Sequence, residues 1–277
     1  MSKQAVVPTI GADPECFLVD PDGTIVPAIG FINGTKENPY RPEGAPKGYG
    51  LQVDNVMLEY NIPPATTPHD FTSNISYAEK LLRSALPKGY GITYTPTHSF
   101  TPKQLSDPAA QEIGCAIDYD AYEGGQPRTA LPALSNLRTC GGHIHLGGDF
   151  NCPQFVAALF CDAVLGIGLH LCNMEAKVAN ERRAWYGAPG IYRPTPYGIE
   201  YRTPSNVWLY AGYSDKIATY ALRLARWLSE TPPAEIRSTF KQIDWALVRA
   251  AMTDKNPNAR VIQPAYSSIH RSGINFV

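Results

Sequence analysis

The chain has 277 residues, of which 44% are apolar, enough to form a sizeable hydrophobic core. This length does not require two domains. A formal net charge of −1 gives no basic surface of the kind that binds membranes or nucleic acid. Composition therefore argues against a membrane partner, and more weakly against a nucleic-acid partner.

The N-terminal half predicts short strands followed by a helix. Up to about Tyr60 we expect strands broken by turns, with an Asp-Gly turn joining two strands within residues 19–30. A helix is predicted over Ser73–Ala85, behind a Ser or Thr cap. Its apolar residues recur on one face: Ile75, Ala78, Leu81, Leu82 and Ala85. Residues 86–96 then return to extended chain.

The middle of the chain predicts a strand and a buried helix. The stretch Ser135–Leu146 is expected to form a strand that enters a glycine-rich segment, and a helix follows from about Pro153. The apolar stretch Phe155–Cys172 contains Asp162 and His170, which makes it too polar for a clean membrane span. We therefore expect a buried helix there.

The targeting signals and cysteines favour a cytoplasmic protein. The first fifteen residues have no long apolar stretch before their acidic residues, so no signal peptide is predicted. The cysteines have no CxxC pairing and are expected to be reduced: Cys16, Cys115, Cys140, Cys152, Cys161 and Cys172.

The rest of the chain is expected to be a loop, a strand and two helices. Proline and glycine recur through Trp185–Tyr201, which predicts an ordered loop leading into a strand. Ser214 is expected to cap a helix with a regular apolar face, ended by Pro232 and Pro233. A further helix is predicted over Ala234–Met252. The elements do not alternate strictly, which favours an α+β fold with a mainly antiparallel sheet.

Four predicted strands alternate ionisable or polar residues with apolar ones. In a strand, residues two apart point to the same face. The polar faces carry Asp13 with Glu15, Glu59 with Asn61, His143 with His145, and Glu200 with Arg202. One such alternation by itself usually means a solvated sheet face, and a lone pair of histidines is ordinary in a strand. Here the polar residues are of the kinds that bind metals and anions, so the four segments together favour a shared site.

The residue types indicate the ligands of that site. Carboxylates with one or two imidazoles suit Mg²⁺ or Mn²⁺. Arginine side chains present planar forks to phosphate oxygens. Four arginines fall in a short run: Arg182, Arg183, Arg193 and Arg202. A metal bound together with phosphates predicts a nucleotide ligand.

Two features do not fit regular strands. Asp54 lies five residues before Glu59, so the two carboxylates would face opposite ways in one strand. Either Asp54 precedes the strand or a bulge re-aims it. Pro14 also interrupts the first strand and requires an edge or irregular pairing.

The segments GADPE, DNVMLEYN, CGGHIHLG and YGAPGIYRPTPYGIEYRTPSN occur in this order. They resemble the phage-type carboxylate–amine ligase (amidoligase) family, which is related to glutamine synthetase and γ-glutamylcysteine ligase. The resemblance covers residues 11–206 and carries no motif in residues 207–277, which we expect to be helical. It implies one catalytic domain over residues 1–277, with a glutamine-synthetase-like curved antiparallel sheet flanked by helices. A phage-encoded protein would act in the host cytoplasm.

The resemblance also implies a reaction. ATP, with Mg²⁺ or Mn²⁺, would phosphorylate a carboxylate, and an amine would attack the acyl phosphate to give an amide. It implies metal ligation by Asp13, Glu15, Asp54, Glu59, His143 and Glu200. It implies nucleotide binding by His145, Arg193 and Arg202, and catalytic roles for Glu59, Arg183, Arg193 and Arg202. The first ligand is Asp13 where better-known relatives have Glu, so its shorter side chain makes direct metal contact less certain than for Glu15.

Two other classes remain open. A cupin-like oxygenase would use the two histidines with Asp149 and a third ligand, for which His170 and His270 are available. A non-catalytic nucleotide- or metal-binding module would need no ADP release. No motif marks the acid or the amine, which are expected to be small molecules or peptides, and none marks the oligomeric state.

Overall fold

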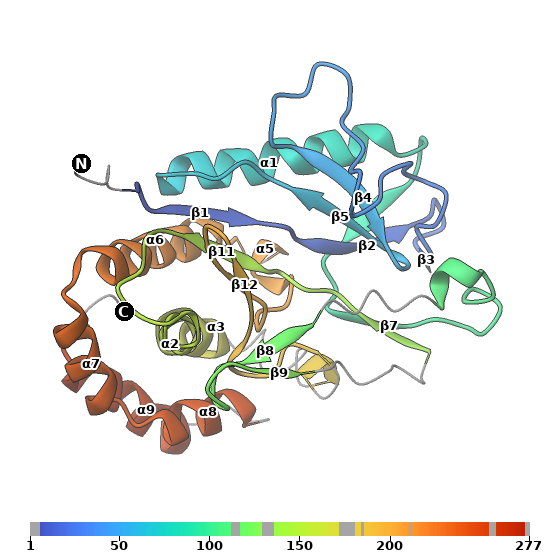
Figure 1. Cartoon of the computed structure of the whole chain (residues 1–277). Helices are drawn as coiled ribbons and strands as arrows, with labels where there is room; N and C mark the ends of the chain where they lie inside the picture. Colours follow the sequence, from blue (N-terminus) through green and yellow to red (C-terminus); the bar gives the residue numbers. More distant parts are fainter. Residues whose placement is uncertain are drawn as a thin grey trace.

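The computed structural model shows strands and helices packed into a mixed α+β architecture (Figure 1). It describes residues 6–111, 117–128, 136–171, 181–183, 186–210, 212–254 and 259–274. The predictions for Cys115, Ser135, Cys172 and Trp185 fall outside these residues. The α+β class is confirmed, whereas the glutamine-synthetase-like fold stays a prediction.

The larger sheet of the described residues has six strands, all paired antiparallel. In spatial order they are β1 (Thr9–Ala12), β11 (Ile144–Gly147), β13 (Gly198–Tyr201), β12 (Ile191–Thr195), β8 (Asp118–Asp120) and β9 (Gln126–Arg128). Three separate parts of the chain thus meet in one sheet, and its central strands come from residues 144–201.

A second antiparallel sheet continues from the first strand. It contains β3 (Ile25–Val26), β2 (Glu15–Val19), β5 (Met57–Asn61) and β4 (Gly50–Asp54), with β6 (Gly91–Thr93) also paired to β2. Asp13 and Pro14 join β1 to β2, and the Pro14 carbonyl still accepts a hydrogen bond from Tyr60. The chain therefore runs across both sheets, and Pro14 marks where it passes from one to the other. A small pair, β7 (Thr97–Ser99) and β10 (Leu137–Thr139), lies beside them.

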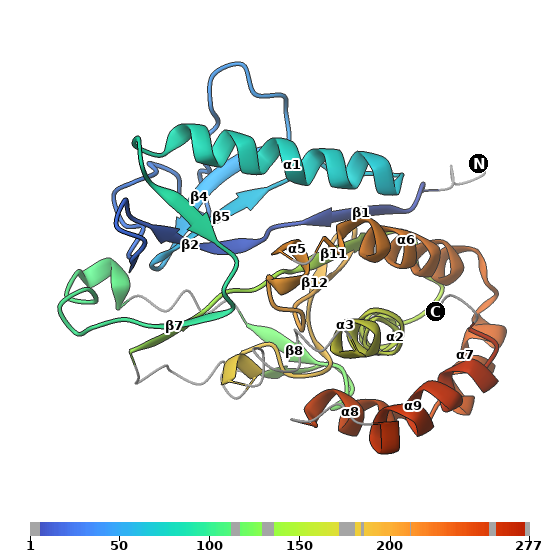
Figure 2. The same ribbon diagram turned by 180° about the vertical axis from the view of Figure 1, so that it is seen from behind.

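Helices cover the apolar faces of the sheets. They are α1 (Pro68–Ala85), a short 3₁₀ turn (Pro108–Ala110), α2 (Gln154–Cys161), a π-helical segment (Asp162–Gly166), α3 (Ile167–Leu171), α5 (Val207–Tyr210), α6 (Ser214–Glu230), α7 (Pro233–Gln242), α8 (Trp245–Thr253) and α9 (Ala259–Arg271). Helix α2 packs on β12 and β13, and α6 packs on β1, β11 and α1. Figure 2 shows α7, α8 and α9 curving around α2 and α3 on the side away from the sheet.

The hydrophobic core lies between the larger sheet and these helices. Ile144 and Leu146 of β11 and Ile199 and Tyr201 of β13 are fully buried in it. These residues alternate with the predicted site residues along both strands. Burying one face in this way leaves His145 and Glu200 on the opposite face.

Several predicted elements are confirmed. The Asp-Gly turn joins β2 to β3, and the buried helix after Pro153 is present as α2 and its continuation. Helix α1 has the predicted apolar face, but it begins at Pro68 because Thr67 caps it by accepting a hydrogen bond from Asp70. In the described residues, no helix is long and apolar enough to cross a membrane.

Other predicted boundaries are wrong. The strand expected over residues 135–146 breaks at its glycines into β10 and β11, and the expected loop before Glu200 is instead the hairpin β12–β13. Ser214 is the first residue of α6 and provides no cap, since the N-cap is Tyr213 without a side-chain hydrogen bond. The helix expected over Ala234–Met252 is two helices, because Asp244 caps the start of α8. Helix α9 lies in residues 207–277, for which the sequence predicts helix, although it is not predicted there as a separate element.

Candidate active site

A row of ionisable side chains crosses the face of the larger sheet that lies opposite the hydrophobic core. His145 on β11 lies opposite Glu200 on β13, and Glu200 lies opposite Arg193 on β12. Residues directly opposite in an antiparallel pair point to the same face. The strand register therefore brings His145 into line with Arg193 and Glu200, which lie 48 and 55 positions further along the sequence.

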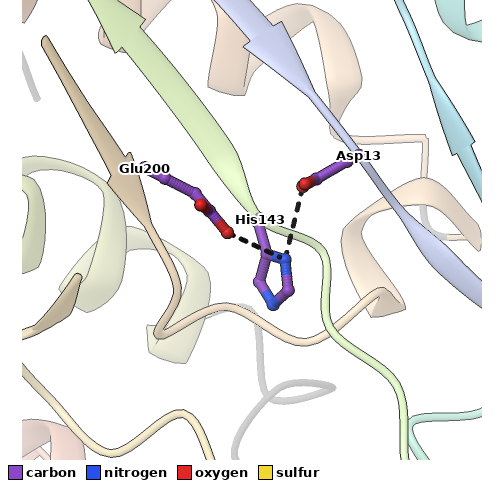
Figure 3. Close-up of side chains that lie close together, drawn as sticks. All are labelled: Asp13, His143 and Glu200. Carbon is purple, nitrogen blue, oxygen red and sulfur yellow. Dashed lines mark ion pairs between the residues drawn. The ribbon is translucent and has the colours of Figure 1, made fainter. Parts of the chain in front are cut away.

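The first cluster beside this row consists of Asp13, His143 and Glu200 (Figure 3). His143 Nδ1 lies 3.3 Å from Asp13 Oδ1 and 3.5 Å from Glu200 Oε1. The candidate ligand atoms of the three residues all lie within 4.8 Å of one another. Ligand atoms around Mg²⁺ are roughly 3–4 Å apart, so small shifts of these side chains would create a cation site.

The second cluster consists of Glu15, Asp54 and Glu59, and its ligand atoms also lie within 4.8 Å of one another. Glu15 on β2 lies directly opposite Glu59 on β5. Asp54 lies at the end of β4, two residues after Gln52, which is opposite Glu59. Asp54 therefore shares the face of Glu59 from a neighbouring strand. Asp54 thus precedes the strand that carries Glu59, which is the first of the two explanations given for its position, and no bulge is needed.

The expected pair Asp13 and Glu15 is divided between the two clusters. Strand β1 ends before Asp13, and β2 begins at Glu15, because Pro14 cannot donate a hydrogen bond to a continuous ladder. The clusters remain within electrostatic reach, since the Asp13 charge helps to raise the pKa of Glu59. The result is one acidic region with two candidate cation positions.

Two arginines bind the acidic groups of this face. Arg202 Nε lies 2.9 Å from Asp118 Oδ1, and its Nη1 is paired with Glu200 Oε1. Arg193 bridges the same two acids, with 3.3 Å from Nη1 to Glu200 Oε2 and 3.3 Å from Nη2 to Asp118 Oδ1. The planar guanidinium groups are thus held at the edge of the first cluster, where each can also offer donors to an anion.

The other two arginines of the run differ in their surroundings. Arg182 is fully buried and donates to the backbone carbonyls of Thr203 and Arg202. Arg183 donates to the Met252 carbonyl at 2.6 Å. It also lines a small pocket, partly open to solvent, with Asp118, Arg128, Tyr186, Gly187, Ala188 and Ile191. Arg183 is therefore beside the site but anchored to helix α8.

Burial and mutual repulsion make it unfavourable for the acids of the two clusters to be ionised all at once. Burial and the nearby Asp54 raise the pKa of Glu15 to about 7. Burial and the Asp13 charge raise the pKa of Glu200 to about 7. The pKa of Glu59 is raised well above its usual range by burial and by its acidic neighbours. A divalent cation would offset this repulsion, so the donor set fits a metal.

The two histidines have opposite electrostatic surroundings. Burial and the Arg202 charge lower the pKa of His143 to about 3, which keeps its imidazole neutral. Burial would lower the pKa of His145, but the Asp13 carboxylate raises it. His145 Nε2 lies 3.1 Å from Asp13 Oδ1. Although burial opposes ionisation of Asp13, the two imidazoles hold its pKa well below the usual range.

The glycines of the segment CGGHIHLGG are required by close packing. A Cβ atom at Gly141 would lie 2.2 Å from His143 Nε2, and one at Gly142 would lie 2.4 Å from the Ser205 carbonyl oxygen. The Gly141 N–H also donates to the Glu15 carboxylate. Side chains at these positions would displace the imidazole or the neighbouring backbone, so the glycines allow the two clusters to approach.

Sequence reasoning missed several residues of the site. Asp118 pairs with Arg193 and Arg202, and its alternation with Asp120 in the segment DYD could have revealed it. Gln52 lies opposite Glu59. Two tyrosine hydroxyls, from Tyr186 and Tyr197, contact the histidines. Both tyrosines lie in the segment YGAPGIYRPTPYGIEYRTPSN, but nothing in the sequence distinguishes them from its other tyrosines, Tyr192 and Tyr201.

The structure brings the predicted site residues together, while their roles stay predictions. All six predicted metal ligands occur in the two clusters. Among the described residues, neither Asp149 nor His270 belongs to a group that could hold a metal, so the arrangement needed for a cupin-like site is not seen there. The acids around His143 come from two other strands instead.

Comparison with known proteins gives the class and the family. A family model matches residues 96–251, more than half of the chain, including both histidines, Glu200 and the arginine run. The match places the chain in the class of proteins named for carboxylate–amine ligation. More specifically, the chain belongs to the phage phiEco32-like COOH·NH2 ligase-type 2 family.

Other comparisons add little. No curated protein matches the chain. Among solved structures, the bifunctional glutathione synthetase from Pasteurella multocida aligns with a TM-score of 0.42 and 12% identity, over 97% of this chain and 48% of that one. The chain thus spans about half the length of that protein. A likeness this low assigns neither fold nor activity.

Proposed function

We propose that the protein is an ATP- and Mg²⁺-dependent carboxylate–amine ligase that works through an acyl phosphate. The proposal includes a single catalytic domain over residues 1–277 with a glutamine-synthetase-like fold. The observation that carries it is the line His145, Glu200 and Arg193 across three paired strands, flanked by two acidic clusters. Family membership supplies the class of reaction.

The two clusters are the proposed metal-binding groups. Asp13, His143 and Glu200 would hold one cation through two carboxylates and a neutral imidazole. Glu15, Asp54 and Glu59 would hold a second through carboxylates alone. Hard oxygen donors of this kind favour Mg²⁺, and Mn²⁺ tolerates the added nitrogen. Bound cations would neutralise charge on the phosphates of ATP.

The cationic side chains are the proposed phosphate-binding groups. Arg193 and Arg202 are already oriented by Asp118 and Glu200. His145, held by Asp13, is proposed to contact the nucleotide. Arg183 and Arg128 line the adjacent pocket, which we assign to an anionic part of a substrate. Preorganised donors stabilise transferring phosphoryl groups without reorganising during the reaction.

The chemistry requires such an arrangement. A carboxylate is a poor electrophile, since its leaving group would be an oxide. Transfer of the γ-phosphoryl group from ATP to a carboxylate oxygen gives an acyl phosphate and ADP. Attack by the amine nitrogen then breaks the acyl C–O bond, releases phosphate and forms the amide, with loss of one proton. Positioning and charge neutralisation account for most of the catalysis in phosphoryl transfer.

The test is ADP release by the purified protein with Mg²⁺, ATP and a pooled panel of amino acids and polyamines. Arg202→Lys should lower kcat by about 10²–10³, because lysine cannot reproduce the fork between Asp118 and Glu200. Arg83→Lys is the matched control, since Arg83 is a surface residue paired with Glu79 on α1. Its activity should be unchanged.

The outcomes separate the competing classes. ADP release that requires a particular acid and amine, and that Arg202→Lys lowers to the predicted extent, would support the ligase and identify its substrates. Binding of Mg²⁺–ATP without ADP release from any substrate pair would favour a non-catalytic module. Failure to bind Mg²⁺–ATP at all would refute the proposal.

A further inference from the structure

Each histidine of the segment HIH (residues 143–145) contacts a tyrosine hydroxyl through the ring nitrogen that is turned away from Asp13. His143 Nε2 lies 3.2 Å from the Tyr186 hydroxyl, while its Nδ1 faces Asp13 and Glu200. His145 Nδ1 lies 2.9 Å from the Tyr197 hydroxyl. The two tyrosines differ in setting, because Tyr197 is 49% exposed and Tyr186 is partly buried.

Tyr186 is fixed in place by two arginines. The guanidinium carbons of Arg182 and Arg202 lie 5.0 and 5.2 Å from the centre of its ring, within the range of cation–π attraction. Arg182 is itself anchored by the carbonyls of Thr203 and Arg202. The next residue, Gly187, has φ +72°, and a Cβ atom there would lie 2.0 Å from Arg182 Nη1. The surroundings therefore hold the Tyr186 hydroxyl against His143.

The position of this hydroxyl has a consequence for the imidazole. A neutral imidazole carries its proton on one nitrogen and a lone pair on the other. The opposite nitrogen, Nδ1, lies 3.4 Å from Arg202 Nη1, a group that can only donate. Nδ1 also faces Asp13 and Glu200, whose carboxylate oxygens accept hydrogen bonds, so in the metal-free site Nδ1–H can donate to Asp13 while Nε2 accepts from the Tyr186 hydroxyl. A cation held between the two acids requires the other tautomer, in which Nδ1 presents its lone pair and Nε2–H donates to the Tyr186 oxygen. The hydroxyl can serve in both states because it donates and accepts.

We infer that Tyr186 is a positioning residue that orients the His143 imidazole and accepts its Nε2–H when Nδ1 ligates a divalent cation. The inference rests on the proposed function, which makes His143 a metal ligand. Without the hydroxyl, the Nε2–H of the ligating tautomer would be buried without an acceptor, which disfavours that tautomer. Groups that orient a ligating histidine in this way affect metal affinity by about 10–100-fold.

The test compares the Mn²⁺ affinity of Tyr186→Phe with that of the wild type. Binding of Mn²⁺ to the full chain is measured by electron paramagnetic resonance without nucleotide. Phenylalanine keeps the ring between Arg182 and Arg202 and removes only the hydroxyl. The Mn²⁺ site that His143→Ala removes should lose about 10–100-fold in affinity. Tyr119→Phe is the matched control, since the ring of Tyr119 contacts Tyr192 rather than a histidine. It should bind Mn²⁺ as the wild type does.

A second measurement gives a direct signature. The ¹⁵N shifts of His143 in the Mg²⁺-saturated wild-type protein should report the Nε2–H tautomer. An Nδ1–H tautomer in the Mg²⁺-saturated wild type would overturn the inference, whether or not the variant folds. Equal Mn²⁺ affinity of Tyr186→Phe and wild type would also overturn it and leave the metal site intact. A wild-type protein that binds no Mn²⁺ would instead refute the metal site and, with it, the inference.

Discussion

Glu15→Gln should make the metal-free protein more stable at pH 8. Glu15 is 5% exposed and lies opposite Glu59, with Asp54 in the same cluster. In the absence of a cation, ionising it costs energy because burial and the Asp54 charge both oppose the charged form. Glutamine removes the charge, and its carbonyl oxygen can still accept the Gly141 N–H bond that the carboxylate accepts in the wild type.

The size of the effect follows from the pKa. The pKa of Glu15 rises from 4.5 to about 7. At about 1.4 kcal/mol for each pH unit, this corresponds to a cost of roughly 3 kcal/mol when the group is ionised. Because the raised pKa makes the folded state bind more protons than the unfolded state, the free energy of unfolding falls as pH increases between 4.5 and about 7. The cost is absent below pH 4.5 and fully present at pH 8.

Urea unfolding in the presence of EDTA measures this cost. The free energy of unfolding of Glu15→Gln should exceed that of the wild type by up to about 3 kcal/mol at pH 8. This difference should largely disappear at pH 5. Glu43→Gln, at an exposed position, should have the same free energy of unfolding as the wild type at both pH values. Added Mg²⁺ should stabilise wild type more than Glu15→Gln. The reasoning is refuted if Glu15→Gln is no more stable at pH 8, or if the difference is the same at both pH values.

Two further substitutions test the core and the glycines. Tyr201→Phe should destabilise the protein by about 1–3 kcal/mol in urea unfolding, because the Tyr201 hydroxyl donates to buried Asp162 at 2.6 Å. Burial raises the pKa of Asp162 to about 6, so the loss should be larger at pH 8 than at pH 5, and an equal loss would contradict this. Gly141→Ala should raise the Kd for Mn²⁺ at least about tenfold by displacing His143. Gly168→Ala, where a Cβ atom meets nothing within 4 Å, should leave the Kd for Mn²⁺ unchanged.

The sequence predicted which residues face the site. Alternation along a strand follows from backbone geometry alone, so it placed His145 and Glu200 opposite the buried Ile144 and Ile199. Helical spacing likewise predicted the buried side of α6, including Ile217, Ala221, Leu224 and Leu228. These local rules need no knowledge of which strands are neighbours.

The sequence could not predict strand boundaries that depend on tertiary packing. The hairpin β12–β13 contains Pro194, which normally opposes a strand, yet pairing with β13 on one side and β8 on the other makes this segment a strand. The segment around Gly141 does not continue strand β11, because Gly141 pairs with Ser205 and its N–H donates to the Glu15 carboxylate. Both outcomes are set by residues far away along the chain.

The sequence by itself determined the kinds of residue on the polar face, and hence the metal- and phosphate-binding chemistry to expect there. Only the tertiary structure decided how these residues group. Pro14 separates Asp13 from Glu15, while the β4–β5 hairpin brings Asp54 beside Glu59. The tertiary structure also decided that Nδ1 of His143 faces Asp13 and Glu200 while Nε2 contacts the Tyr186 hydroxyl. The physical reason is that alternation is a property of one strand, whereas register and side-chain contacts arise only when distant strands pair.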